Sequence, residues 1–169
     1  MSESPAGQTS SSLEGTGVGV QTAGVIAPPP VLYAVPLAAG LLLQHWYPLP
    51  ILSAGRPTLL GIVLVLGGAL GAPALIAFRR ANTSPKPWVP STALVTTGPY
   101  RFTRNPMYLG FTLMYLGVAV WSNALWPLLF LPLVLVAMHY GVILREEAYM
   151  ASTFGADYEA YRERVRRWL

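Results

Sequence analysis

The chain has 169 residues, of which 53% are hydrophobic and only 11% are charged, less than half the charged share of an ordinary globular protein. Charged residues are absent from 15–55, from 57–78 and from 105–144, and a soluble core of this size could not bury all three stretches. This composition excludes a disordered chain, a disulfide-rich secreted scaffold and a conventional soluble enzyme. It predicts an all-α, polytopic membrane protein.

The residue inventory also limits the chemistry. There is no cysteine, and His45 and His139 are the two histidines, so a thiolate zinc site and a catalytic cysteine are excluded and a multi-histidine metal site is disfavoured. We therefore expect no metal. Catalysis would have to use carboxylates, guanidinium groups, backbone amides and a bound cofactor.

Four apolar segments organise the chain. Residues 1–24 are rich in Ser, Gly and Thr without apolar periodicity, which predicts a disordered tail before a single membrane domain at 25–169. Within that domain, Gly67 and Gly71 stand at GxxxG spacing, which favours close contact between helices in lipid. The expected membrane spans are 28–46, 57–78, 106–120 and 124–144.

The polar C-terminal segment has a helical pattern of its own. Tyr158, Tyr161, Val165 and Trp168 recur at helical spacing, with Arg and Glu on the opposite face. This pattern predicts an amphipathic helix that lies on a membrane surface.

Charge placement predicts the topology. With four spans, the 79–105 connection and both termini share one side, and of the 11 basic residues Arg56 alone falls on the other. The positive-inside rule makes the shared side cytoplasmic. The net charge of +4 then needs no nucleic acid, because the basic cluster Arg162, Arg164, Arg166 and Arg167 suits anionic lipid headgroups. The pattern does not specify an oligomeric state.

Polar groups concentrate in two segments at that side of the membrane, GPYRFTRNPMYLG (98–110) and LREEAYM (144–150). Asn105 is a good N-cap and Pro106 suits the first helical position, so a helix should begin here with free backbone amides. Together with Arg101 and Arg104, such a helix end attracts a carboxylate or a phosphate. Tyr108, in the first turn, adds an aromatic hydroxyl.

The second segment contributes two carboxylates. Glu146 and Glu147 are adjacent, and neighbouring side chains on a helix point about 100° apart, so one of them must face the helix bundle. A carboxylate at that depth needs a cationic partner, such as Arg104 or the ammonium group of a cofactor, and is a candidate functional residue. The pattern leaves open which glutamate takes this role.

These motifs, in this order, resemble a known family. The order TALVTTGPYRFTRNPMYLG, an apolar hairpin, two glutamates and FGADYEAYRERVRRW resembles the isoprenylcysteine carboxyl methyltransferases and their phospholipid methyltransferase relatives. The resemblance covers about residues 57–169. It implies an integral membrane enzyme that uses S-adenosylmethionine (SAM).

The resemblance also implies a cofactor pocket covered by the 79–105 connection and the C-terminal segment. Arg104 would neutralise and orient an anionic group, and Glu147 would anchor the cationic part of the cofactor, so both are expected to be catalytic. The residues implied to contact SAM are Thr92, Ala93, Leu94, Val95, Gly98, Tyr100, Arg104, Asn105, Pro106, Tyr108, Leu113, Leu116, Glu146 and Glu147.

The expected reaction is methyl transfer to a lipophilic acceptor that arrives from the bilayer, foremost a carboxylate of the isoprenylcysteine type. The carboxyl methyltransferases usually have His where this chain has Asn105, and the Asn-Pro-Met-Tyr pattern is closer to the phospholipid enzymes. An amine acceptor on a phospholipid is therefore the alternative. A membrane NADPH-dependent reductase of the sterol reductase type is a further alternative, and a non-catalytic membrane scaffold is the third.

The four-span topology gives a direct test. Single cysteines introduced at Ser91 and Ser122 of this cysteine-free chain should react with an impermeant thiol reagent from opposite sides of the membrane, because an odd number of spans separates them. Labelling of both from the same side would contradict the topology.

Overall fold

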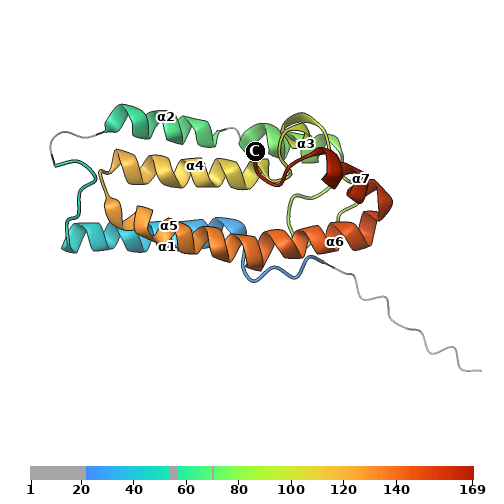
Figure 1. Cartoon of the computed structure of the whole chain (residues 1–169), viewed down its shortest axis with the longest axis horizontal. Coiled ribbons are helices and arrows are strands. Elements are labelled where there is room, and N and C mark those ends of the chain that lie inside the picture. The colour runs from blue at the N-terminus through green and yellow to red at the C-terminus, as the bar shows by residue number, and fades with distance from the viewer. Residues whose placement is uncertain (1–21, 54–56, 70) are drawn as a thin grey trace, which may run out of the picture.

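The computed structural model of the chain describes residues 22–53, 57–69 and 71–169. Across these residues the regular structure is helical and contains no β-strand, which confirms the all-α prediction. Figure 1 shows an elongated bundle with α3, η1 and α7 gathered at one end. The elements are α1 (Pro29–Trp46), α2 (Thr58–Gly68), α3 (Gly71–Arg80), the 3₁₀ turn η1 (Gly98–Arg101), α4 (Pro106–Trp121), α5 (Leu125–Met138), the π turn η2 (His139–Ile143), α6 (Leu144–Phe154) and α7 (Ala156–Arg164).

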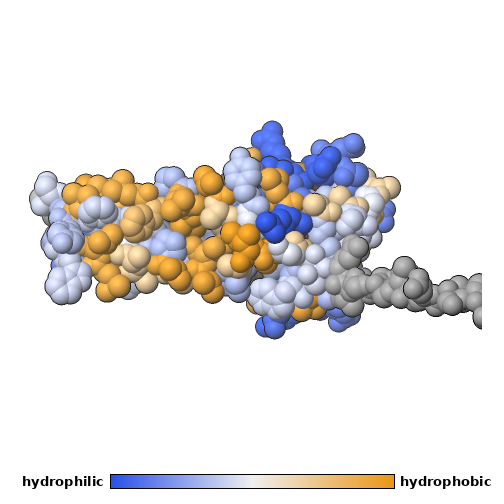
Figure 2. Space-filling model, turned by 90° about the horizontal axis from the view of Figure 1, so that it is seen from below, coloured by the Kyte–Doolittle hydropathy of each residue, from blue (hydrophilic) through white to orange (hydrophobic). Residues whose placement is uncertain are grey.

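Two helical segments are long and apolar enough to cross a membrane, Thr58–Arg80, taken across residue 70, and Leu125–Phe154. In the most apolar stretch of each segment, only 18% and 33% of the residues, respectively, are buried inside the molecule. Most of these apolar side chains therefore face outward. Figure 2 shows the hydrophobic surface along the bundle and the hydrophilic residues at the end that carries α3 and α7. Since α4 is apolar but shorter, the four-span arrangement stays a prediction.

The helix boundaries match the expected segments in part. The helices α1 and α4 begin and end within a residue of the expected 28–46 and 106–120. The helix that contains the expected fourth span, 124–144, continues beyond it, because α5, η2 and α6 follow one another without a break to Phe154. No glycine or proline occurs between Leu144 and Phe154, and the helix ends at Gly155, whose φ is +50°. Both glutamates therefore lie inside a helix rather than at its end.

The helices pack in two pairs, α2 with α4 and α1 with α5. Close approach of α2 and α4 depends on glycines, because a Cβ atom on Gly117 would lie 2.5 Å from the backbone nitrogen of Val65. Gly61 approaches Trp121, and Gly68 approaches Met114, so the two helices run antiparallel. Of the expected Gly67 and Gly71 pair, Gly67 meets only Leu113, at 3.4 Å from a Cβ atom, whereas the backbone of Gly71 lies against Gly110 of α4, 3.1 Å from a Cβ atom there.

The polar end of the molecule has its own apolar cluster. Its buried side chains come from α3, the 79–105 connection and α7, and they are Ala74, Ala77, Phe78, Val95, Tyr100, Tyr158, Tyr161 and Val165. The Tyr161 hydroxyl donates to the carbonyl of Tyr100 at 2.8 Å, which fixes α7 against η1. The sequence predicted that the apolar face of the C-terminal helix, α7, contacts lipid, and this part of the prediction is wrong. The protein itself buries that face.

The glycine contact predicts a difference between two substitutions. Gly117→Ala should lower the free energy of unfolding by about 1–3 kcal/mol, because its Cβ would overlap backbone atoms of α2 that cannot move alone. Gly71→Ala, where a Cβ would meet nothing within 4 Å, should be neutral or slightly stabilising. Thermal unfolding in detergent measures both, and equal effects would show that α2 and α4 do not need this close approach.

Candidate functional site

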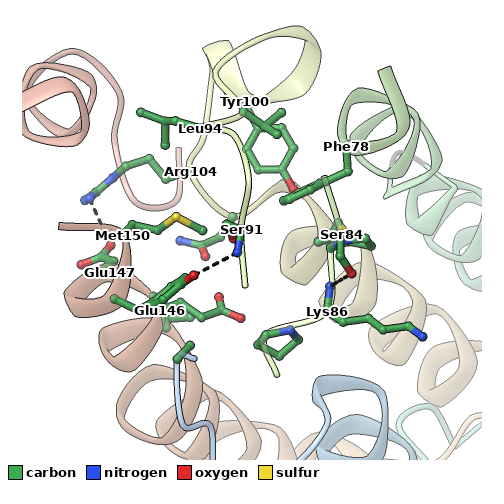
Figure 3. Close-up of a pocket in the computed structure, with 18 of the residues that line it drawn as sticks. Phe78, Ser84, Lys86, Ser91, Leu94, Tyr100, Arg104, Glu146, Glu147 and Met150 are labelled. Atoms are coloured by element: carbon green, nitrogen blue, oxygen red, sulfur yellow. Dashed lines mark hydrogen bonds and ion pairs between the residues drawn. The ribbon is translucent and has the colours of Figure 1, made fainter. Parts of the chain in front are cut away.

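A cavity opens at the polar end of the bundle, between the 79–105 connection, the start of α4, α6 and α7 (Figure 3). Of the residues implied to contact a cofactor, nine line it: Ala93, Leu94, Val95, Tyr100, Arg104, Asn105, Tyr108, Glu146 and Glu147. The structure thus brings together two segments about 40 residues apart in the chain. Thr92, Gly98, Pro106, Leu113 and Leu116 are not among the lining residues, and Leu113 lies beside Gly67 on α2.

The connection folds over the cavity because its polar groups have defined partners. The amide of Thr92 donates to the Thr83 hydroxyl at 3.0 Å, and the Thr92 hydroxyl donates to the carbonyl of Asn82 at 3.1 Å. The amide of Ser91 donates to the Tyr149 hydroxyl at 2.9 Å, which joins the connection to α6. Thr92 therefore stabilises the fold of the covering segment.

Glu147 is shared by two arginines. Its carboxylate lies 3.1 Å from Arg104 Nη1 and accepts two hydrogen bonds from Arg167, at 2.9 Å from Nε and 2.7 Å from Nη2. The bond to Glu147 raises the pKa of Arg167 above its ordinary value. Two guanidinium groups on one carboxylate leave this cluster with a net positive charge.

Arg104 retains binding capacity beyond Glu147. Its side chain is 10% exposed, and Nη1 also donates to the Tyr158 hydroxyl at 3.3 Å. Its buried Nε atom has no hydrogen-bond partner among the described residues. A buried donor without a partner costs about 1–3 kcal/mol, so Arg104 is suited to receive an anionic ligand.

Glu146 has different surroundings from its neighbour. It accepts a hydrogen bond of 2.6 Å from the Tyr108 hydroxyl and forms no salt bridge with any described residue. Its carboxylate lines the cavity. The two adjacent glutamates therefore have different roles: Glu147 joins arginines of two distant segments, and Glu146 lines the cavity without a cationic partner among the described residues.

Asn105 does not cap α4 with its side chain, contrary to expectation. Its Nδ2 instead donates to the carbonyl of Arg167 at 2.9 Å, and the Thr103 hydroxyl donates to the same carbonyl at 3.1 Å. The amide of Arg104 donates to the carbonyl of Arg166 at 2.9 Å. The start of α4 is thus occupied by the C-terminal segment. Arg101 lies exposed on η1 and does not line the cavity.

Burial raises the pKa of several tyrosines of the cavity, among them Tyr158 and Tyr161. Desolvation of Tyr100, assisted by the charge of Glu146, raises the pKa of its hydroxyl well above the ordinary value. This hydroxyl therefore stays protonated, which excludes it as a base.

Sequence reasoning missed several residues of the cavity. Arg167 was assigned to lipid headgroups, and no local signal links it to a glutamate 20 positions away. Tyr149 could have been found, because it follows Glu146 by three positions and so shares its helix face. Ser91, Lys86 and Met150 also line the cavity (Figure 3).

A second hollow, an apolar groove, lies between α4 and α5. Leu109, Thr112, Leu135, Val136, His139, Tyr140 and Trp168 line it. On α4, the cavity uses Asn105 and Tyr108, and the groove uses the next turn, Leu109 and Thr112. The groove therefore begins within one turn of α4 from the cavity, although the two share no lining residue.

Comparison with known proteins identifies the family. The model of the phospholipid methyltransferase family matches residues 57–157, and the chain belongs to this family. It is 40% identical over 72 residues to a protein-S-isoprenylcysteine O-methyltransferase of Schizosaccharomyces pombe, covering 43% of this chain and 30% of that protein. It is 31% identical over 107 residues to the cobalt-zinc-cadmium resistance protein CzcN of Cupriavidus metallidurans, covering 63% of this chain and 44% of the relative.

A third relative is an uncharacterized protein of Haemophilus influenzae, 35% identical over 63 residues, which are 37% of this chain and all of that protein. The chain thus spans less than half the length of the first two relatives. In the described part of the chain, no group of three or more His, Asp or Glu side chains could hold a metal ion.

The shared carboxylate predicts a stability effect. Glu147→Gln should lower the free energy of unfolding by about 2–3 kcal/mol, because it leaves the largely buried Arg104 beside a second cation without its counter-ion. Thermal unfolding in detergent measures the effect. Glu159→Gln removes an exposed ion pair with Arg162 and should cost about 0–1 kcal/mol, so a loss from Glu147→Gln no larger than this would refute the structural role of Glu147.

Proposed function

We propose that this protein transfers the methyl group of SAM to a lipophilic acceptor that reaches the cavity from the bilayer. The observation that carries the proposal is a cavity lined both by Arg104, whose buried Nε has no partner among the described residues, and by Glu146, which forms no salt bridge there. SAM carries a carboxylate, an ammonium group and a sulfonium, so it needs anion-binding and cation-binding groups within one cavity.

The residues of the cavity fit this charge pattern. Arg104 would hold the carboxylate of the cofactor, and Glu146 would face its cationic part. The connection at Ala93–Val95, with Tyr100, would cover the nucleoside. When bound, SAM supplies an electrophilic methyl group on a sulfonium.

Catalysis would depend mainly on alignment. The protein needs to hold the acceptor in line with the methyl group and to exclude water, and such positioning is worth up to about 7–11 kcal/mol. The covering connection and α7, whose Tyr158 and Tyr161 are 4% exposed, would keep water out. Glu147, neutralised by Arg104 and Arg167, would keep these walls in place.

The apolar groove between α4 and α5 supports a lipophilic acceptor. Because the groove begins within one turn of α4 from the cavity, a hydrocarbon chain could lie in the groove while the reacting group reaches the cavity. The relative named as an isoprenylcysteine O-methyltransferase favours a carboxylate as that group. A carboxylate is already ionised at neutral pH and needs no base.

An amine acceptor is the second candidate, and one observation supports it. An amine must lose a proton, and Glu146, held by Tyr108 without a cation, is placed to accept one. An NADPH-dependent reductase is less consistent with the cavity, because Glu146, which forms no salt bridge with a described residue, would oppose the 2′-phosphate of that cofactor.

The four-span topology is part of the proposal. The cavity residues lie at the end where the basic residues gather, so we place the 79–105 connection and the C-terminus on the cytoplasmic side.

The test uses purified protein, SAM with a labelled methyl group, and two acceptors, a prenylated cysteine with a free carboxylate and an amine-headgroup phospholipid. We expect label in the prenylcysteine as a methyl ester, which releases volatile methanol in base, whereas an N-methyl product keeps its label. Transfer to the phospholipid alone would establish the amine function instead. Absence of SAM binding by calorimetry would refute the proposal.

The binding role of Arg104 has its own test. Arg104→Gln should weaken SAM binding by about 2–4 kcal/mol, because the cofactor carboxylate would be buried without a charged partner. Arg162→Gln, an exposed arginine on α7, is the matched control and should bind SAM as the parent does. If both variants bind SAM as tightly as the parent in calorimetric titrations, Arg104 does not hold the cofactor.

A further inference from the structure

One wall of the cavity comes from outside the family region. Residues Ala23–Ile26, here named the N-terminal strap, precede α1 and lie beyond the 57–157 match. Figure 1 shows this segment passing along the helix formed by α5 and α6 before it enters α1. Ala23 is 8% exposed and lines the cavity together with Arg104 and the glutamates.

The strap is fastened at both sides of the cavity. On one side, the amide of Ala23 donates to the carbonyl of Pro87 in the covering connection at 3.2 Å. On the other, the amide of Ile26 donates to the carbonyl of Gly141 in η2 at 3.1 Å. The strap therefore links the connection to the long helix across the cavity.

The π turn provides the seat for the strap. The Ile26 side chain lies directly on Gly141, where any Cβ atom would overlap its Cδ1 and Cγ1 atoms. A glycine at this position leaves a notch in a helix surface that is otherwise covered by side chains. π turns are rare and occur often at functional sites, which makes this contact unlike ordinary helix packing.

Arg145 provides a third attachment. Its Nη1 donates to the carbonyl of Gly24 at 2.7 Å. Arg145, Glu146 and Glu147 thus contact three different segments: the strap, Tyr108 on α4, and the C-terminal Arg167. One turn of α6 positions three walls of the same cavity.

We propose that the N-terminal strap is a binding wall of the cofactor cavity, and that Arg145 is the positioning residue that keeps it closed over the bound cofactor. The proposal rests on the proposed function for the identity of the cofactor. Its physical consequence is slow release, because the cofactor cannot leave past Ala23 until the contacts to Gly24 and Gly141 open.

Contact between the strap and the cofactor is tested by protection of a cysteine. The Ala23→Cys variant of this cysteine-free chain should react with a small thiol reagent at least about fivefold more slowly in saturating SAM. Thr153→Cys, on the exposed part of α6, is the control and should react at the same rate with and without SAM. Equal labelling of the Ala23→Cys variant with and without SAM, when calorimetry shows that SAM is bound, would overturn the proposal. Failure of the parent to bind SAM would instead overturn the proposed function.

The positioning role of Arg145 is tested by release kinetics. Arg145→Gln should raise the dissociation rate of labelled SAM about three- to tenfold, because the charged donor to Gly24 is lost. Arg145→Lys keeps a cationic donor and should restore most of the slow release, and Arg162→Gln should change nothing. A dissociation rate in Arg145→Gln equal to that of the parent would overturn the role of Arg145.

A second pair of variants tests the seat on η2 independently. Gly141→Leu should displace Ile26 and speed release of SAM, and the double variant Gly141→Leu, Ile26→Ala, which restores the space, should release SAM more slowly than Gly141→Leu alone. If the two substitutions change the dissociation rate of SAM additively, the strap does not depend on the contact between Ile26 and Gly141.

Discussion

The polar end of this protein depends on one carboxylate. Glu147 lies inside a helix, 14% exposed, and its two oxygens contact Arg104 at the start of α4 and Arg167 near the C-terminus. A carboxylate at this depth needs counter-charge, and two arginines from distant segments supply it. The pairing joins the start of α4, α6 and the C-terminal segment, and the first two contribute Arg104, Tyr108, Glu146 and Glu147 to the cavity wall. The hydrogen bonds from Thr103 and Asn105 to the carbonyl of Arg167 also join the start of α4 to the C-terminal segment.

Neutralising Glu147 within the protein gives Glu146 its different role. The two glutamates are adjacent in sequence, yet a step of about 100° around the helix directs one to the arginines and the other to Tyr108 and the cavity. The chain belongs to the phospholipid methyltransferase family, and the methyl donor proposed here, SAM, requires both a rigid frame and a site for its cationic part. Here one pair of residues contributes to each. The unpartnered Nε of Arg104 adds the complementary anion-binding group.

The molecule separates this polar chemistry from its apolar bundle. Glycines let α2 and α4 approach closely, and most apolar side chains of the two long helical segments face outward, as lipid requires. The cavity lies at the polar end, and the apolar groove begins within one turn of α4 from it. The residues that line the cavity include Ala23, Tyr158 and Tyr161, which lie on either side of the family match at 57–157. The core of the family is thus completed by segments from both ends of this chain.

The sequence by itself determined the helical class, the start of α4 at Pro106 and the polar segments that supply the cavity. These features depend on local properties, namely apolar run length, proline at a helix start and clustered charge. The partner of Glu147, the role of Asn105, the placement of α7 and the contacts of Ala23 and Gly24 were decided by the tertiary structure. Each of these joins residues tens of positions apart, so no local pattern encodes it. The continuation of the last long helix past the expected span end at Leu144 has a related reason: helix propensity and the buried contacts of Glu146, Glu147 and Tyr149 extend it to Phe154.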